Sequence, residues 1–298
     1  MGNANVDVIA FVDRHPSAGE RVEARRLERA PGGAASNFAV AAARLGAHAI
    51  LLGCVGLDEE GEWLLDRLRG SGVDVSMVSR VSAPTGVALV VVDAGGERTM
   101  VVHRGANALL PQVLRERPLP PADWVHAASV PPDLAAEVFA SAKRAGAITS
   151  YDPGGTVARL GFEGLRSALE LTDVLLVNEA EARALAGPRG VGGLAPTVVV
   201  KLGARGAVAW VGGREYGAEG FRVEVVDTTG AGDVFDAAFA LGVLRGLSPG
   251  EALTFANACA ALKITRVGGQ ASPSLEEVAR LLRERGYGAL ALKLAGNL

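Results

Sequence analysis

The sequence is poor in residue types that mark several classes of protein. Among its 298 residues there are only two cysteines, Cys54 and Cys259, both in apolar stretches, so neither a disulfide framework nor a CxxC motif is present. The four histidines show no metal-ligand spacing, which argues against a zinc enzyme. These absences favour a reduced, cytoplasmic setting.

Long apolar runs and an excess of one charge are also missing. Thirty basic residues stand against 33 acidic ones, giving a net charge of −3, so little positive charge is available to bind nucleic acid or an anionic membrane. We expect neither a membrane span nor an export signal, because no apolar run approaches a spanning length and the first residues lack a basic-then-apolar pattern. With 49% hydrophobic residues, the chain can bury a sizeable core.

Glycine, in contrast, is abundant. The 39 glycines are about twice the usual share of roughly 7%. Short G-x-G matches therefore arise by chance, and a glycine motif has meaning only when its neighbours support it.

Short apolar runs alternate with longer helical patterns along the chain. Strands are expected at residues 48–55, 123–129, 147–152, 173–178 and 196–201. Continuous apolar strands separated by helices are typical of βαβ units, whose parallel sheet is covered on both faces. The sequence therefore predicts an α/β fold, a three-layer αβα Rossmann-like core with a mostly parallel sheet.

Two stretches break this alternation. Residues 20–29, and the pair 85–93 and 97–104 joined by Ala94-Gly95-Gly96, alternate with period two and have hairpin turn chemistry. They predict a small inserted β-sheet, either a flap over an active site or a decorative edge. Because no repeat or Pro/Ser-rich linker occurs, we expect one domain over residues 1–298, with lid strands inserted at about 10–31 and 84–105.

The strongest constellation lies at residues 221–246. A strand-like run ends at Asp227, a Thr-Thr-Gly-Ala-Gly turn follows, and a long apolar helix begins at about Asp233. Gly230 and Gly232 let backbone N–H groups converge at the helix N-terminus, which makes an anion cradle. Asp233 would repel an anion there, but it suits a base that takes a proton from an acceptor hydroxyl during phosphoryl transfer. The alternative is an ordinary first-turn carboxylate.

The string DTTGAGD at residues 227–233 resembles the C-terminal signature of the ribokinase-like (PfkB) carbohydrate kinase family. Residues 31–46, PGGAASNFAVAAARLG, resemble the family's N-terminal signature, and the two occur in family order. The resemblance covers essentially the whole chain. It implies the ribokinase-like fold and a kinase that moves the γ-phosphoryl group of ATP to a hydroxyl of a sugar or sugar-like molecule, with Mg²⁺ as cofactor.

The resemblance also implies roles for individual residues. Asp233 would be the base, and the anion hole would be formed by Gly230, Ala231 and Gly232. The acceptor would bind to Asn5, Asp7, Gly32, Gly33 and Asn37. Independently of the resemblance, Arg104 could reach the acceptor from the predicted lid strands. The nucleotide would contact Asn178, Glu181, Lys201, Gly203, Gly206, Thr228 and Asn257, and Glu181 would help to place Mg²⁺ indirectly. A monovalent cation, K⁺, would be held by Asp227, Thr229, Ser272 and the carbonyls of Lys263, Arg266 and Gly268.

Several of these residues also have a purely structural interpretation. Asn178, followed by acidic residues, is typical of a helix N-cap, and Asn257 could be a polar residue on a buried helix. Asn37 could simply lie in the first turn of a helix. Lys201 is one of only four lysines beside 26 arginines, a scarcity that favours a specific role.

The identity of the acceptor stays open. Ala34 stands where true ribokinases have a lysine, so ribose itself is not favoured. Arg98 and Arg104 suit a carboxylate or phosphate, as in 2-keto-3-deoxygluconate or ribose-1-phosphate, with ATP or ADP as donor, unless they are exposed strand arginines. A nucleoside is a further alternative. A non-catalytic sugar-binding relative and a dinucleotide oxidoreductase are disfavoured.

Two further expectations concern the start of the chain and its assembly. Relatives place a buried strand before the segment that contains Asn5 and Asp7, so here the first strand is truncated, or it is built from residues 4–12, or the natural chain starts upstream of Met1. Lid strands in this family often pair between subunits, which implies a homodimer.

Overall fold

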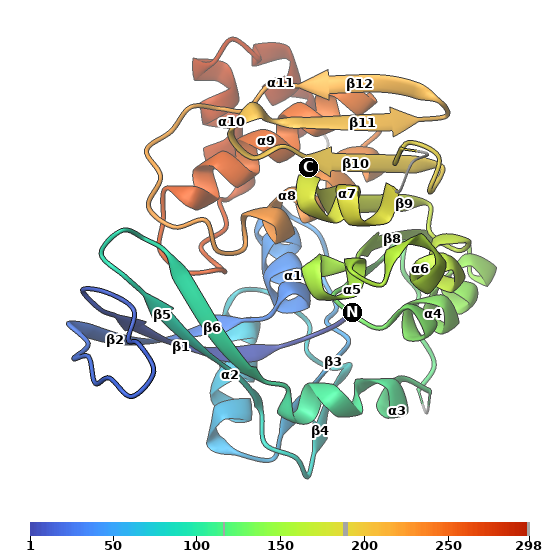
Figure 1. The fold of residues 1–298 in the computed structure, drawn as a ribbon. Helices are drawn as coiled ribbons and strands as arrows, with labels where there is room; N and C mark the ends of the chain where they lie inside the picture. Colours follow the sequence, from blue (N-terminus) through green and yellow to red (C-terminus); the bar gives the residue numbers. More distant parts are fainter. Residues whose placement is uncertain (116, 187–189, 297–298) are drawn as a thin grey trace.

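The computed structural model describes residues 1–115, 117–186 and 190–296 (Figure 1). Its strands are β1 (Asn5–Phe11), β2 (Arg26–Gly32), β3 (Gly53–Gly56), β4 (Val78–Val81), β5 (Gly86–Val92), β6 (Arg98–His103), β7 (Trp124–Ala128), β8 (Ile148–Asp152), β9 (Val174–Asn178), β10 (Thr197–Lys201), β11 (Ala207–Val211) and β12 (Arg214–Ala218). Its helices are α1 (Ala34–Arg44), α2 (Glu59–Gly70), α3 (Leu110–Arg115), α4 (Pro132–Arg144), α5 (Gly154–Ala158), α6 (Gly161–Leu169), α7 (Glu179–Ala186), α8 (Ala231–Leu244), α9 (Pro249–Ile264), α10 (Leu275–Glu284) and α11 (Gly288–Gly296), with 3₁₀ turns η1 (Gly105–Leu109) and η3 (Gly203–Arg205).

A six-stranded sheet forms the centre of the protein, in the order β12-β11-β10-β9-β8-β7. Strands β7 to β10 are parallel, whereas β11 and β12 are antiparallel additions at one edge. Alternate residues of β9 face opposite sides of the sheet: Val174 and Leu176 pack with α1, α8 and α9, while Leu175 and Val177 pack with α4 and α6. The predicted three-layer αβα core is confirmed.

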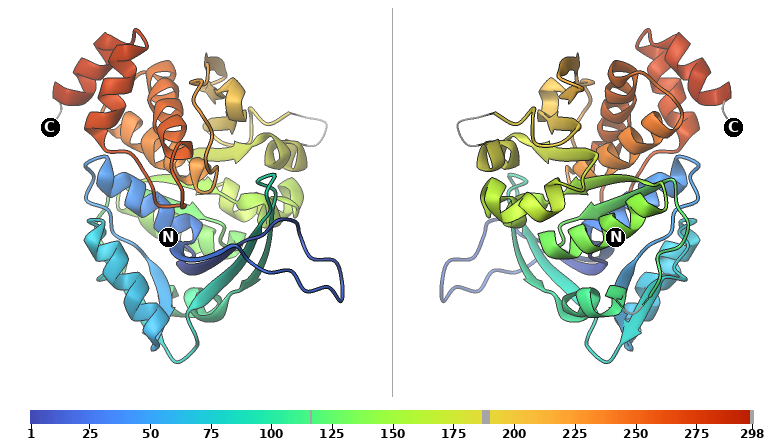
Figure 2. Two further views of the ribbon diagram at one scale, coloured as in Figure 1. Left: turned by 90° about the vertical axis from the view of Figure 1, so that its left-hand side faces the viewer. Right: turned by 90° about the vertical axis from the view of Figure 1, so that its right-hand side faces the viewer.

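A four-stranded sheet, which we call the accessory sheet, stands out from this body (Figures 1 and 2). Its order is β2-β1-β5-β6, with β1 and β5 parallel and the outer pairs antiparallel. Asp7 of β1 lies opposite Ala88 of β5, which lies opposite Val102 of β6, so these three residues share one face. The opposite face carries Leu89 and Val101.

Three expected strands differ from the observed ones. Residues 20–25 form no strand, and pairing with β1 begins only at Arg26. Residues 221–227 also form no strand: the amides of Val226 and Asp227 both donate to Ile264 O, at 2.7 and 3.1 Å, at the end of α9. Their alternating apolar residues resemble the pattern of a strand. This segment, however, bonds to the C-terminal end of α9 and not to the edge of a sheet. The strand expected at 48–55 is shorter and begins at Gly53.

The start of the chain is divided between the two sheets. Gly2 makes a parallel bridge with Ala128 beside β7, and the first strand then runs from Asn5 to Phe11 in the accessory sheet. The first strand is thus built within residues 4–12, which is one of the possibilities that the sequence leaves open. None of the helices in the described ranges has the length and apolar character needed to cross a membrane.

Candidate active site

The glycine-rich turn leads directly into α8. Gly230, the N-cap residue, has a φ of +74°, and a Cβ atom there would lie 2.4 Å from Gly269 O, so both conformation and space require glycine. The helix begins at Ala231, slightly earlier than expected. The Ala231 amide donates to Thr228 O at 3.2 Å and so is not open to an anion, which leaves the first-turn amides of Gly232 and Asp233 for that role.

Asp233 lies in the first turn of α8 and contacts α1. Its Oδ2 accepts a hydrogen bond of 2.8 Å from Asn37 Nδ2, across 196 residues of sequence. Burial, reinforced by the charge of Asp152, raises the pKa of Asp233 to about 6, although the bond from Asn37 opposes the rise. A carboxylate of this basicity, at the mouth of an anion cradle, is suited to general-base work near neutral pH.

The predicted acceptor residues gather around Asp7. A Cβ atom at Gly32 would lie only 2.2 Å from Asp7 Oδ2, so the carboxylate rests directly against the glycine backbone. Burial raises the pKa of Asp7 to about 6. Gly33 is the N-cap residue of α1, and Asn37 lies in that helix, so the same short segment contacts both Asp7 and Asp233.

Asn107 of η1, absent from our predictions, holds Asn5 in place. Its Nδ2 donates to Asn5 Oδ1 at 2.8 Å and to Ala4 O at 3.1 Å, and its Oδ1 accepts from the Ala4 amide at 3.0 Å. Asn107 is 1% exposed. A lone asparagine in a loop carries no distinctive sequence signal, so only the fold identifies it.

The two lid arginines occupy different environments. Arg98 of β6 donates to the hydroxyls of Thr228 and Thr229, the second of these bonds being very short, and lies 3.7 Å from Asp227 Oδ1. It therefore binds the glycine-rich turn before α8, residues 228–232, which we call the phosphoryl turn. It does not contact the predicted acceptor residues. The side chain of Arg104 is exposed and forms no ion pair with any residue in the described ranges, while its carbonyl lies beside Gly86, the strand partner of Asn5.

Lys201 ends β10 and is buried between two carboxylates that our sequence analysis missed. Its ammonium donates to Asp152 Oδ2 at 2.7 Å and to both oxygens of Asp236, at 2.9 and 3.0 Å. The two carboxylates hold the pKa of Lys201 above its usual range despite burial. A Cβ atom at Gly232 would lie 3.4 Å from the ammonium, which places this charge beneath the anion cradle. The positive charge of Lys201 therefore lies close to the backbone of this turn.

The pKa values of the two carboxylates are shifted in opposite directions. Burial and the neighbouring Asp152 raise the pKa of Asp236 well above its usual range, whereas Lys201 lowers the pKa of Asp152 against the effect of burial. The position of each residue in the sequence could have pointed to the site. Asp152 ends a parallel strand, and Asp236 lies one helical turn after Asp233.

Asn178 and Glu181 form a reciprocal helix cap at the start of α7. Asn178 Oδ1 accepts from the amides of Ala180 and Glu181, both at 2.9 Å, and Glu181 Oε2 accepts from the Asn178 amide at 2.8 Å. Burial and the charge of Asp152 raise the pKa of Glu181. The described residues contain no group of three or more metal-ligating side chains. Glu181 and Asp152 nevertheless fit Mg²⁺, which binds through one or two carboxylates together with substrate phosphates.

Of the other predicted nucleotide residues, Asn257 and Gly206 lie near the end of β12, and Thr228 lies at the turn before α8. Asn257 of α9 donates through Nδ2 to Ala218 O and Glu219 O, at 3.1 and 3.2 Å, so its amide fixes the backbone after β12. Gly203 and Gly206 shape the turn between β10 and β11, where the Leu202 amide donates to Gly206 O. Thr228 contacts Arg98, as described above.

The six residues expected to bind K⁺ do not fit that ion as they stand. The side chain of Lys263 is itself directed among them, and its ammonium donates to Asp227 O at 2.7 Å and to Arg266 O at 3.4 Å. Asp227 Oδ1 accepts from the Thr229 amide, and Oδ2 accepts from the Gly268 amide, both at 2.8 Å.

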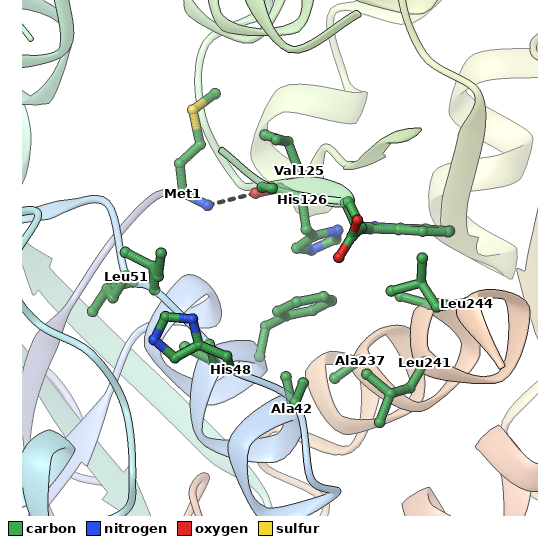
Figure 3. Close-up of a pocket in the computed structure, with 18 of the residues that line it drawn as sticks. Met1, Ala42, His48, Leu51, Val125, His126, Ala237, Leu241 and Leu244 are labelled. Carbon is green, nitrogen blue, oxygen red and sulfur yellow. Dashed lines mark hydrogen bonds between the residues drawn. The ribbon is translucent and has the colours of Figure 1, made fainter. Parts of the chain in front are cut away.

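A pocket of about 440 Å³ lies apart from these groups (Figure 3). It is lined by apolar residues of α1 and α8 and by Met1, His48 and His126, and its described lining includes neither Asp233 nor Lys201. The candidate site is therefore identified by its side chains and not by this cavity.

Comparisons with known proteins find relatives that match almost the whole chain. Over residues 1–276 the sequence matches the pfkB family of carbohydrate kinases. An ATP-dependent ribose-1-phosphate kinase of Halopiger xanaduensis is 38% identical over 290 residues, which cover 95% of this chain and 97% of the relative. The crystal structure of ribokinase from Thermotoga maritima is similar with a TM-score of 0.84 and 30% identity, and that of ribokinase from Arabidopsis thaliana, complexed with ribose and ATP, with 0.81 and 28%; each covers 95% of this chain and 97% of the known structure. The chain therefore belongs to the PfkB family of carbohydrate kinases.

Proposed function

We propose that this kinase transfers the γ-phosphoryl group of ATP to a hydroxyl of a sugar, with Asp233 as the general base. The observation that carries the proposal is the placement of Asp233: it lies at the N-terminus of α8, has a raised pKa, and is joined by Asn37 to the segment that contacts Asp7. One carboxylate is thus next to both the anion cradle and the acceptor residues. That position suits the proton transfer that accompanies attack on a phosphoryl group.

Each remaining group has a task that follows from its chemistry. Asp7 and Asn5 offer oxygen atoms to sugar hydroxyls, which need paired donors and acceptors. The amides of Gly232 and Asp233, with Lys201 beneath them, stabilise negative charge on the phosphoryl group. Glu181 and Asp152, together with the nucleotide, would hold Mg²⁺, which would supply charge neutralisation at the phosphates.

We also propose that the accessory sheet is a lid over the acceptor and that the acceptor carries an anionic group, as a sugar 1-phosphate does. Met100 and Val102 share the face of this sheet that carries Asp7, and they are 54% and 49% exposed, so they are available to cover a bound sugar. Arg104 follows directly and has an exposed guanidinium, a group that binds phosphate in a bidentate manner. The similarity to a ribose-1-phosphate kinase supports the same class of acceptor.

The replacement Asp233→Asn tests the base. It keeps the shape of the side chain but removes its basicity, so we expect kcat to fall by about 10²- to 10⁴-fold while the dissociation constant for ATP changes little. Coupled ADP release and calorimetric titration measure the two quantities. Glu163→Gln, a replacement of an exposed carboxylate on α6, is the matched control and should keep full activity. Retention of most of the activity by Asp233→Asn would exclude this residue as the base.

The acceptor class is tested by a panel of pentoses, hexoses, nucleosides, sugar acids and sugar phosphates, each assayed with ATP and with ADP. We expect the highest kcat/KM for a sugar phosphate with ATP. Arg104→Ala should then raise the KM for that acceptor by roughly 10- to 100-fold, as expected for the loss of one charge-assisted contact worth about 1.5–3 kcal/mol. Arg21→Ala, on an exposed loop, is the control. If neutral ribose is the best acceptor and Arg104→Ala leaves its KM unchanged, the anionic assignment is wrong.

A further inference from the structure

The charge at the base of the phosphoryl turn comes from the protein itself. Lys263, in the last turn of α9, is 0% exposed. Its ammonium lies 2.7 Å from Asp227 O, 3.4 Å from Arg266 O and 3.8 Å from Asp227 Oδ2. Three oxygens of the candidate monovalent-cation site therefore face a cation that is covalently part of the chain.

Asp227 connects this ammonium to the phosphoryl turn. One carboxylate oxygen accepts from the amide and the hydroxyl of Thr229, directly before Gly230, and the other accepts from the Gly268 amide. These bonds, with the charge of Lys263, hold the pKa of Asp227 below its usual range although burial opposes them. The position of the Thr229 backbone, and hence of the helix start at Gly230, is thus set by a carboxylate that rests on Lys263.

The charge balance leaves no role for an additional cation. Asp227 contributes one negative charge, whereas Lys263 and the guanidinium of Arg98, 3.7 Å from Asp227 Oδ1, contribute two positive charges. A monovalent cation among the same oxygens would be repelled by both groups and would need the space that the ammonium occupies.

We propose that Lys263 is a positioning residue that replaces the monovalent cation, so that the phosphoryl turn is organised without K⁺. Ser272 marks the limit of the replacement: its hydroxyl is buried and has no hydrogen-bond partner among the described residues, so the ammonium takes over the carbonyl and carboxylate ligands but not this one. The inference rests on the proposed kinase activity.

The intact enzyme provides the first test. We expect the rate with ATP, Mg²⁺ and the best acceptor to change by less than about twofold when tetramethylammonium is exchanged for K⁺ at matched ionic strength, which keeps general screening constant. A much larger increase with K⁺ would overturn the proposal. The absence of turnover in either salt would instead refute the kinase activity, so the two failures are distinguishable.

Two substitutions at Lys263 provide the second test. Lys263→Ala vacates the site, and we expect at least about a tenfold loss of kcat without K⁺, because the Asp227 carboxylate is left without its buried partner. K⁺ should restore much of that loss. Lys263→Met refills the space with an apolar side chain, so we expect the same loss with no response to K⁺, a pattern that simple destabilisation does not produce.

Lys293→Ala removes a surface lysine that pairs with Glu251 and should behave like the intact enzyme in both salts. Equal behaviour of Lys263→Ala in the two salts, with a folded circular dichroism spectrum, would contradict the proposal. If this variant does not fold, the salt dependence of the intact enzyme still decides the question.

Discussion

At the scale of single residues, the protonation of Asp233 is set by a balance between burial and one hydrogen bond. Burial raises its pKa to about 6, and the Asn37 amide, which bonds to the charged form, opposes the rise. A base must be unprotonated to accept a proton. The rate is therefore expected to be full above about pH 7 and to fall as the pH decreases through about 6.

Asn37→Ala should shift the pH range in which the rate falls on the acidic side of the profile, which we call the acidic limb. Loss of the bond to the charged carboxylate raises the pKa of Asp233, so kcat at saturating substrates should begin to fall at a higher pH, by up to about one unit. The pH profile of kcat measures the shift. Gln270→Ala, which removes a neighbouring amide that bonds Ser36 and not Asp233, should leave the limb in place. A limb that stays put or moves to lower pH in Asn37→Ala would show that another group limits the rate.

The sequence pointed to candidate site residues that belong to a recognisable motif. It did not point to residues outside the motifs that contact a motif residue only in the folded protein. Asp233, Asn37 and Asp7 have a recognisable spacing and lie where contacts between them are possible. Asp152 and Asp236 were missed because each is one aspartate in an ordinary strand or helix, and their importance depends on sharing the Lys201 ammonium. Such a contact depends on tertiary distance, which residue type alone does not encode.

At the scale of elements, the accessory sheet has two apolar faces with different surroundings. One face carries Asp7 and the proposed acceptor-covering residues. The other carries Leu27, Leu89 and Val101, which are 68%, 52% and 67% exposed. Exposed apolar side chains gathered on one sheet are typical of an association surface. We propose that this outer face pairs with the same face of a second copy, which is the homodimer implied by the family resemblance.

Val101→Lys tests this assembly. A charge on the outer face should be costly to bury, so we expect the dimer to dissociate at micromolar concentration while the monomer stays folded. Sedimentation velocity measures the change in mass. Leu292→Lys, at a residue of α11 that is 71% exposed, is the matched control and should stay dimeric. An intact protein that is monomeric at all concentrations would refute the proposal, as would an undiminished dimer in Val101→Lys.

The regular elements were predictable wherever local pattern and burial agree. The strands β9 and β10 are apolar except at their ends because both faces of the sheet are covered, so their apolar runs in the sequence are continuous. Residues 221–227 alternate apolar and polar residues as a half-buried strand does, yet Val225 and Val226 are 58% and 54% exposed and belong to no sheet in the described structure. A high β-propensity means that a segment is able to pair with the edge of a sheet. The sequence does not show whether the fold places such an edge beside it.

At the scale of the whole molecule, the site forms where chain segments distant in sequence end together. Asp152, Asn178 and Lys201 are the last residues of three adjacent parallel strands, and Lys201 pairs in register with Asn178. Ligand sites at the carboxyl ends of parallel strands follow from this topology, so the location of the nucleotide side could be anticipated. The meeting of the central and accessory sheets could not, because it depends on packing between separate parts of the fold.

Arg98 links the accessory sheet to the turn that precedes α8, and this link bears on how the enzyme uses ATP. Its guanidinium belongs to the accessory sheet but binds Thr228 and Thr229 at the phosphoryl turn. Any hinge movement that lifts the accessory sheet from the acceptor pocket must also withdraw this positive charge from the turn. A nucleotide held while the acceptor site is open would then lack part of the charge that favours its cleavage, so this link would limit hydrolysis of ATP by water.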